Sequence, residues 1–543
     1  KGCAYRTFPL DRDNDPTGST VNSFTRVFYT GESSTDEAVF LIEGGPGFSN
    51  HAFIPVADFL LSLNPGWTIY LQDHRGTGLS SPVNCAENPS FYFNPSNTTE
   101  YQSCNDYIIA NYGSVMAHHN TYNAARDLKE TIDIINPPKV GIYALSYGTF
   151  FTNTYMQIPG ARYDAVVLDG PLPPGRWLME FNAVWNSQVS NDLTDLCVRE
   201  SSVCSDAFDE MGHHPRLIMD ALIDGSLPCL DKLPWLREED GVHLVRTYNN
   251  YLTATKDAHV LMGPFWHRLL RCTDEDAAQL NTFHAQRTAA DTYRSPTYDY
   301  SYGLGINIIA SELYSLATDD VALTYEQQLV VMSRMFSDGG GQYSSSFARD
   351  VSNWPRYTPP AISRNFATPT AQVLILIGSL DPNTQFGLGK WFERGLGDNA
   401  QMVKVPYATH GTLTATDTCV HAMIYEFFTT WGASVNTSCT TSSYYTPPDF
   451  DGSEAPARGM SEYMFGTADV WNNGHQLDAN STSDAVAMTS EDSCDCDWED
   501  EDVEVVLGST LAGMFLLVCL VVLFFVLKWT PKTTDTLMSD SKL

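Results

Sequence analysis

Residues 140–150, VGIYALSYGTF, place one serine between an apolar run and the start of a helix. Val140–Leu145 is rich in β-branched and aromatic residues, which is typical of a strand covered on both faces. Ser146 follows it, and Gly148 lets the next helix pack close to the strand. The stretch nearly matches G-x-S-x-G, a sharp turn that exposes a nucleophilic serine, but Ala144 replaces the first glycine. A structural turn serine explains this pentapeptide equally well, so other residues must decide.

Further apolar runs of the same kind recur along the chain. They are AVFLI from Ala38, WTIYL from Trp67, AVVLD from Ala165, VLILI from Val373 and MVKV from Met402. Before VGIYAL, residues 120–135 place apolar side chains at helical spacing, with Asn120 or Thr121 available as the N-cap. This alternation of strand and helix predicts an α/β fold around a mostly parallel sheet.

Two further candidate catalytic residues follow predicted strands. Asp381 lies in GSLDPNTQ after VLILI, and His410 lies in ATHGTL after MVKV. Acyl transfer needs a nucleophile, a base and a group that orients the base. We predict Ser146 as nucleophile, Asp381 as orienting acid and His410 as base. Each alone also reads as a turn or loop residue, but the chain order Ser, Asp, His strengthens the set.

The sequence GGPG at residues 44–47 follows the strand AVFLI. Glycines let the backbone approach a substrate and aim N–H groups at a developing negative charge. We predict Gly44, Gly45 and the amide of Tyr147 as oxyanion donors. In DHRGTGLSS, after WTIYL, we expect Asp73 and Arg75 to form an ion pair that fixes the glycine loop, with no direct chemistry.

The pattern changes along the chain and predicts several regions. We expect a core in two parts, 1–171 and 369–440, interrupted by a mostly helical lid at 172–368. Residues 441–505 are Ser/Thr/Pro-rich and then acidic, which predicts an extended stalk. A transmembrane helix at 506–527 and a cytosolic tail at 528–543 complete the prediction.

The membrane prediction rests on Val506–Leu527, an uncharged apolar run long enough to cross a hydrocarbon core about 30 Å thick. Lys528 and Lys532 follow it, so the positive-inside rule predicts a type I protein with residues 1–505 outside the cytosol. No apolar leader precedes Lys1, which fits either a removed signal peptide or a truncated sequence. We interpret the ending Ser541-Lys542-Leu543, which matches a peroxisomal address, as coincidence.

Charge and cysteine content constrain partners and compartment. The net charge of −34, from 31 Lys and Arg against 65 Asp and Glu, argues against nucleic acid as a partner. Twelve cysteines indicate an oxidising compartment. Loop-closing spacings suggest three disulfide pairs. Among the other cysteines outside the predicted span, we expect at least one unpaired or intermolecular thiol. Glycosylation sequons at three asparagines agree with an extracytosolic location for residues 1–505. The pairs are Cys85–Cys104, Cys197–Cys204 and Cys419–Cys439, the remaining cysteines Cys3, Cys229, Cys272, Cys494 and Cys496, and the sequons Asn97, Asn436 and Asn480.

The chain resembles the prolyl and tripeptidyl aminopeptidase group of α/β-hydrolase serine peptidases. The matching stretches are GGPGFS, LQDHRGTGLSSPVNC, NAARDLKETIDII, ALSYGTF, YDAVVLDGPLPP, FNAVWNSQVSNDLTDLCVRESSVC, GSLDPNTQ and ATHG, across roughly residues 38–440. The resemblance implies an α/β-hydrolase fold, the catalytic roles given above and removal of residues from a free peptide N-terminus. It also implies a carboxylate in the lid that holds the substrate ammonium, and Glu312 is the candidate. Ala144 and the stalk, span and tail depart from the family.

Two other functions stay open. An esterase or lipase would use the same three residues, and an inactive adhesion or receptor ectodomain would keep the fold without the reaction. The sequence contains no H-E-x-x-H motif and no dinucleotide-binding glycine fingerprint after a strand, so we predict no metal and no cofactor. The oligomeric state is not predicted.

Overall fold

The computed structural model describes residues 1–31, 37–85, 98–175, 181–210, 215–238, 241–291, 300–314, 335, 354–413, 417–441 and 444–472. These residues divide into two compact units, one built around a sheet and one helical, and each is described by itself. The predicted stalk from residue 473 onward, the membrane span and the tail lie outside the described residues, as do the sequons at Asn97 and Asn480. Among the helices that are described, none is long and apolar enough to cross a membrane.

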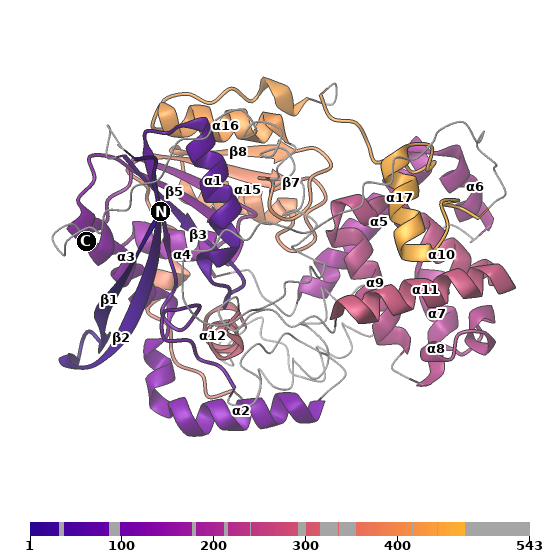
Figure 1. Cartoon of the computed structure of the whole chain (residues 1–543), viewed down its shortest axis with the longest axis horizontal. Coiled ribbons are helices and arrows are strands. Elements are labelled where there is room, and N and C mark those ends of the chain that lie inside the picture. Colours follow the sequence, from indigo (N-terminus) through magenta and orange to yellow (C-terminus); the bar gives the residue numbers. More distant parts are fainter. Residues whose placement is uncertain are drawn as a thin grey trace. The chain divides into compact units, whose positions relative to one another are not determined.

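The sheet unit comprises residues 2–189 and 294–446. Its sheet has eight strands in the order β1-β2-β4-β3-β5-β6-β7-β8 (Figure 1). The strands are β1 (Gly2–Asp11), β2 (Asp15–Phe28), β3 (Glu37–Ile42), β4 (Trp67–Gln72), β5 (Val140–Leu145), β6 (Ala165–Asp169), β7 (Gln372–Gly378) and β8 (Ala400–Val405). All neighbours from β4 to β8 pair in parallel, whereas β2 is antiparallel to both β1 and β4.

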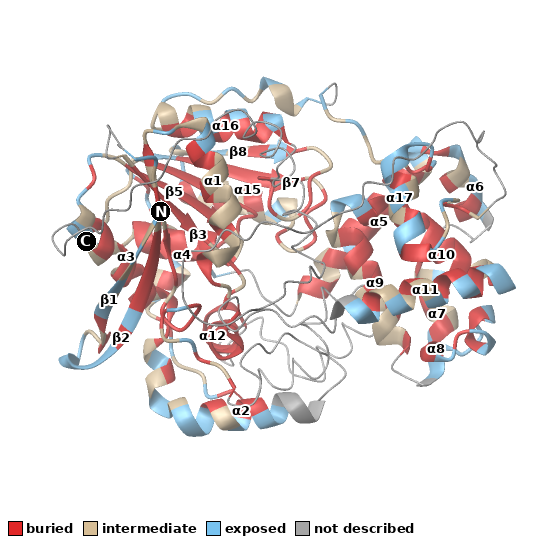
Figure 2. Cartoon of the chain, viewed as in Figure 1, coloured by how far each residue is buried: buried red, intermediate tan, exposed pale blue. Residues whose placement is uncertain are grey.

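The parallel strands match the six apolar runs. Strands β3, β5, β6 and β7 are almost completely buried and carry nearly continuous apolar sequences (Figure 2), whereas β8, at the edge of the sheet, is buried only at Val403 and Val405. The hairpin of β1 and β2 was not predicted. The first half of β1 alternates between exposed and half-buried residues, so its sequence lacks the apolar run of a central strand.

Helices cover both faces of the sheet. On one face α1 (Ile54–Leu63) and α16 (Thr418–Thr429) share a buried cluster with the strands. On the other face α3 (Thr121–Ile135), α4 (Tyr147–Met156) and α15 (Phe386–Leu396) share a second cluster. The predicted cap of α3 is confirmed, because the Asn120 side chain accepts the Asn123 N–H at 2.8 Å.

The sheet unit contains further helical segments, α2 (Thr98–Tyr112) and α12 (Tyr302–Ile308), the latter continued by a π-helical turn at Ile309–Leu313. All residues of α12 and of the π turn are buried, and several join the cluster of α3 and α4. The predicted lid at 172–368 includes residues 302–313. The structure instead makes them part of the core, because their apolar side chains join the buried cluster formed by α3, α4 and the sheet.

The described residues of the helical unit lie within 190–291 and 447–472. Its helices are α5 (Asn182–Glu200), which begins in the sheet unit, α6 (Ser202–Glu210), α7 (Pro215–Ile223), α8 (Trp235–Glu238), α9 (Gly241–Ala254), α10 (Met262–Arg271), α11 (Asp274–Asp291) and α17 (Ala455–Phe465). Helix α17 and Trp471 lie in the predicted stalk, yet Phe465 and Trp471 are only 1% and 2% exposed. The stalk prediction is therefore wrong for residues 447–472, which pack on the helical unit.

Disulfides link both units internally. The three predicted pairs, Cys85–Cys104, Cys197–Cys204 and Cys419–Cys439, are present. A fourth joins Cys229 to Cys272, which sequence spacing had left unassigned. Cys494 and Cys496 lie outside the described residues.

Candidate active site

Ser146 occupies the turn between β5 and α4. Its φ of +56° and ψ of −124° form a conformation that residues other than glycine rarely adopt. The Ser146 N–H donates to the carbonyl of Asp169 at 2.9 Å, which ties the turn to the end of β6. Ser146 is half-buried. The turn thus presents this side chain at the carboxyl edge of the parallel strands.

Small residues flank the turn for steric reasons. A Cβ on Gly148 would lie 2.4 Å from the carbonyl oxygen of Ile42, so α4 can pack this closely only with glycine there. Ala144 is fully buried and pairs in register with Ile42 and Leu168. The sharp turn therefore forms with alanine at the first glycine position of the motif.

Asp381 and His410 form a hydrogen-bonded pair. Asp381 is 1% exposed, and its Oδ2 lies 2.9 Å from His410 Nδ1. The N–H groups of Asn383 and Thr384 each donate to Asp381 Oδ1 at 2.8 Å, and the Thr384 hydroxyl donates to Oδ2 at 2.8 Å. Since an ionised carboxylate only accepts, His410 carries a proton on Nδ1, which leaves Nε2 of the neutral ring as the acceptor.

The environment of the imidazole increases its basicity. Burial lowers the pKa of His410, but the charge and hydrogen bond of Asp381 outweigh burial, and the charges of Asp169 and Glu43 add to the rise. The pKa of His410 is therefore raised above its ordinary value of 6.5. A general base near neutral pH benefits from this arrangement.

Asp169 connects the Ser146 turn with the His410 loop. Its carbonyl holds the Ser146 N–H, while its carboxylate accepts the N–H groups of Thr412 and Leu413 at 2.7 and 3.1 Å. The structure thereby gathers the three predicted catalytic residues on neighbouring loops at the carboxyl ends of β5, β7 and β8. Asp381 and His410 contact each other directly, and Ser146 joins them through this shared neighbour.

The glycine loop after β3 lies directly against Ser146. A Cβ on Gly44 would lie 2.7 Å from Ser146 Cβ and 3.2 Å from its Oγ. The Gly44 N–H, predicted as an oxyanion donor, donates instead to Glu43 Oε1 at 2.9 Å. The Tyr147 N–H lies at the first position of α4, where no carbonyl of a preceding helical turn accepts it. Gly45 follows with a φ of +106°.

Sequence reasoning gave Glu43 no role, although it stands at the end of β3 immediately before the glycines. Glu43 is half-buried, and burial raises its pKa to about 7 despite the hydrogen bond from Gly44. Its own N–H donates to Asn50 Oδ1 at 2.6 Å. Together with His74 and Tyr147, it lines a cavity behind the glycine loop.

The expected ion pair between Asp73 and Arg75 is wrong. Arg75 forms a two-point contact with Asp127 of α3, with both nitrogen–oxygen distances 2.7 Å, while Arg26 of β2 lies 3.4 Å from Asp73. Both residues lie in the loop after β4, and each meets a partner that is distant in the chain. Asp73 acts on the glycine loop indirectly, because it accepts the Asn50 N–H at 2.9 Å and Asn50 Oδ1 accepts the N–H of Glu43, the residue before the glycines.

Glu312 lies in the π-helical turn and is 9% exposed. Its Oε1 accepts the Thr121 N–H at 3.0 Å and the hydroxyl of Tyr357, whereas its buried Oε2 has no hydrogen-bond partner among the described residues. Burial raises the pKa of Glu312, and these hydrogen bonds oppose the rise.

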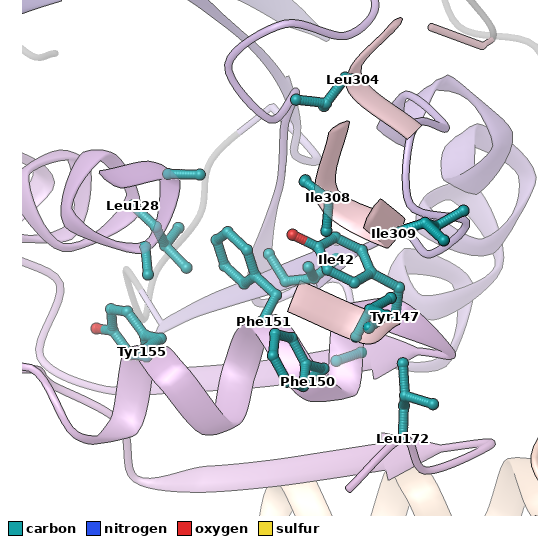
Figure 3. Close-up of a cluster of buried hydrophobic side chains, with 14 of the residues drawn as sticks. Ile42, Leu128, Tyr147, Phe150, Phe151, Tyr155, Leu172, Leu304, Ile308 and Ile309 are labelled. Carbon is teal, nitrogen blue, oxygen red and sulfur yellow. The ribbon is translucent and has the colours of Figure 1, made fainter. Parts of the chain in front are cut away.

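Thr121 connects Glu312 to the residue after the nucleophile. The Thr121 hydroxyl lies 2.7 Å from the Tyr147 hydroxyl, which is 3.3 Å from His74 Nε2. Figure 3 shows the Tyr147 ring beside Ile42 and near Ile308 and Ile309, the segment that precedes Glu312. The carboxyl of Glu312 is thus linked through Thr121 to the hydroxyl of Tyr147, the residue that follows Ser146.

Comparisons with known proteins agree with this architecture. A family model described as alpha/beta hydrolase fold matches residues 37–196, and one described as TAP-like protein matches residues 340–439. No curated protein sequence matches the chain.

Solved structures with similar chains belong to several kinds of enzyme. A proline iminopeptidase from Mycobacterium smegmatis is 13% identical, over 79% of this chain and 99% of its own, with a TM-score of 0.36. An esterase from Exiguobacterium antarcticum is 12% identical over 76% and 96%, with a TM-score of 0.31. Epoxide hydrolase A from Mycobacterium thermoresistibile is 15% identical over 80% and 100%, with a TM-score of 0.32. Similarity at this level does not distinguish among these activities.

Proposed function

From an α/β-hydrolase fold with a helical insertion and a TAP-like C-terminal region, we propose that this protein is a serine exopeptidase. It would release residues from the free N-terminus of peptides through an acyl-enzyme. The observation that carries the proposal is the constellation at the carboxyl edge of the sheet. There a serine in a strained turn adjoins glycine-loop backbone, and a buried Asp381–His410 pair lies on neighbouring loops.

The residues support a two-step acyl transfer. Ser146 Oγ attacks the scissile carbonyl while His410 Nε2 takes its proton, and His410 then protonates the leaving amine. Water, activated by the same nitrogen, releases the acyl group from Ser146. The Tyr147 N–H and an amide of the glycine loop, from Gly44 or Gly45, are the donors to the oxyanion in this proposal. For Gly44 to donate, its N–H must leave Glu43 Oε1.

Recognition of a free N-terminus is assigned to Glu312. A substrate ammonium taken out of water needs an anionic partner. The Oε2 atom of Glu312 is buried without a hydrogen-bond partner among the described residues, and the same carboxyl is hydrogen-bonded to Thr121, a neighbour of Tyr147. Glu43 adds a second acidic group beside the nucleophile.

The compartment and the anchor complete the proposal. Four disulfides among the described residues and an exposed sequon at Asn436 suit an oxidising, extracytosolic location. We retain Val506–Leu527 as a membrane anchor with the hydrolase domain outside the cytosol.

The test is product mapping by mass spectrometry with free and N-acetylated peptides, using the wild type and Ser146→Ala. We expect the wild type to shorten free peptides from the N-terminus, acetylation to abolish cleavage, and Ser146→Ala to lose at least about 10³-fold in rate. Glu312→Gln should raise KM for free peptides more than it lowers kcat. Cleavage of acyl esters without any peptide cleavage would instead establish an esterase, and a wild type with neither activity would leave only an inactive ectodomain.

A further inference from the structure

We propose that Asp169 is a positioning residue that fixes Ser146 and the His410 loop relative to each other and supplies a second carboxylate charge beside the imidazole. The inference rests on the proposed role of Ser146 and His410, but not on the choice of peptide as substrate. Asp169 ends β6, between the strands that carry Ser146 and Asp381, and it is fully buried.

The backbone around Asp169 is held from both sides. Its carbonyl accepts the Ser146 N–H at 2.9 Å, and the following N–H, of Gly170, donates to the Leu376 carbonyl of β7 at 3.0 Å. A Cβ on Gly170 would lie 2.8 Å from His410 Cε1, so the imidazole packs directly on this glycine. The residue after β6 therefore packs against the imidazole of His410 and limits where the ring can lie.

The Asp169 side chain holds the loop that carries His410. Its Oδ2 accepts the Thr412 N–H at 2.7 Å, the Thr412 hydroxyl at 3.0 Å and the Leu413 N–H at 3.1 Å. It also accepts the Tyr143 hydroxyl of β5 at 2.8 Å. Four donors on one oxygen join β5, β6 and the His410 loop, so the carboxylate sets their mutual spacing.

All four of these donors are neutral, and no cation among the described residues forms an ion pair with Asp169. Its other oxygen, Oδ1, is buried without a hydrogen-bond partner there. Burial raises the pKa of Asp169, while the hydrogen bonds from Tyr143, Thr412 and Leu413 favour its ionised form. A buried carboxylate without a cation beside it acts on nearby charges more strongly than a carboxylate in an ion pair.

The negative charge of Asp169 raises the pKa of His410. The charged groups that influence the ring are Asp381 after β7, Asp169 at the end of β6 and Glu43 at the end of β3, and each raises the pKa of His410. Removal of the Asp169 charge should therefore lower that pKa. A purely architectural role for Asp169 would leave the pH dependence of the nucleophile unchanged.

The experiment compares Asp169→Asn with Asp417→Asn in the full-length chain. Asp417 is a matched control because it is also buried and also accepts two backbone N–H groups and a tyrosine hydroxyl, but it caps α16. The readout is the rate of Ser146 labelling by a fluorophosphonate from pH 5 to 9. Labelling reports the nucleophile and its base without dependence on any substrate.

We expect Asp169→Asn to label about 10- to 100-fold more slowly at the optimum, because the His410 loop loses its anchor. The midpoint of the acid limb should move down by about 0.5 pH unit, since the base loses a negative neighbour. Asp417→Asn should keep the wild-type midpoint. An unchanged midpoint and rate in Asp169→Asn would overturn the inference.

If Asp169→Asn does not fold, Thr412 provides the second test. Thr412→Val removes one donor to Asp169 and keeps the backbone N–H, whereas Thr412→Ser keeps both. We expect labelling to fall several-fold in Thr412→Val and to recover in Thr412→Ser, and equal rates in both would also overturn the inference. A wild type that labels without cleaving peptides would refute only the exopeptidase, whereas a wild type that does not label would refute both proposals.

Discussion

At the scale of single residues, Glu43 occupies an unusual place for an acid. It ends a buried strand, contacts the backbone of the glycine loop and lies near the Asp381–His410 pair. The charge of Glu43 contributes to the raised pKa of His410. Burial raises the pKa of Glu43 itself to about 7, although the hydrogen bond from Gly44 and the charge of His410 act to lower it.

The raised pKa of Glu43 predicts that the stability of the protein depends on pH. Because the pKa of Glu43 is raised from 4.5 to about 7, its neutral form favours the folded state. That contribution is fully present below pH 4.5 and is lost as pH rises through about 7. Glu43→Gln keeps an acceptor for the Gly44 N–H and never ionises. We expect its unfolding free energy relative to wild type to increase by about 1–2 kcal/mol between pH 5 and pH 8.

Urea denaturation at the two pH values measures this difference. The exposed Glu462 offers a control, since Glu462→Gln should show the same difference from wild type at both pH values. A Glu43→Gln variant that behaves like the control would mean that the carboxyl is ionised throughout this range.

At the scale of elements, the position of α4 depends on a single missing side chain. The Cβ that Gly148 lacks would collide with the carbonyl oxygens of Ile42 and Glu43, at 2.4 and 2.9 Å. Both are backbone atoms, one at the last residue of β3 and one at the residue after it, and they cannot rotate away as a side chain could. The close approach of α4 to β3 also places the Tyr147 N–H beside the glycine loop, so packing and chemistry share one constraint.

Gly148→Ala should therefore destabilise the protein by about 2–4 kcal/mol and displace the Ser146 turn. We expect a lower melting temperature and at least a tenfold loss in fluorophosphonate labelling. Gly387→Ala is the matched control, because Gly387 also lies in the first turn of a helix, α15, and a Cβ there meets no atom within 4 Å. That variant should be as stable as the wild type or slightly more stable.

At the scale of the whole molecule, the segment after the sheet unit belongs to the helical unit. Phe465 stacks on Phe283 with ring centroids 5.3 Å apart, and the buried guanidinium of Arg268 lies 4.2 Å from the Phe465 ring. Arg268 also donates to the carbonyls of Val470 and Asp469, at 2.8 and 3.2 Å. The helical unit is thus assembled from two stretches of chain separated by the second half of the sheet unit.

Truncation tests this assembly. A chain that ends at Thr446 loses α17 and Trp471 and leaves their apolar partners exposed, so we expect the helical unit to lose about 5 kcal/mol or more. A chain that ends at Asn472 keeps these contacts and should melt like the longer protein. Differential scanning calorimetry with limited proteolysis distinguishes the two, and equal stability would contradict the assigned packing.

Much of the sheet could be predicted, because buried parallel strands carry continuous apolar runs that stand out locally. The partners of the charged side chains could not be predicted. Arg75 pairs with Asp127 and Asp73 with Arg26, although the sequence favoured a pair between neighbours. Helix α17 carries local boundary features, Pro456 at its start and Gly466 at its end, but its polar surroundings obscured them.

The sequence by itself determined the α/β architecture, the serine turn and the order of the candidate catalytic residues, because each depends on residues adjacent in the chain. Only the tertiary structure decided that Asp381 forms a hydrogen bond with His410 and that Asp169 joins the loop carrying His410 to Ser146. It also decided that the Gly44 N–H donates to the Glu43 carboxyl. The contacts of Asp381 and Asp169 join strand ends that are far apart in sequence, whereas Glu43 and Gly44 are neighbours whose contact depends on how the turn after β3 folds. Burial decides their energies, and burial is a property of the folded chain rather than of any segment.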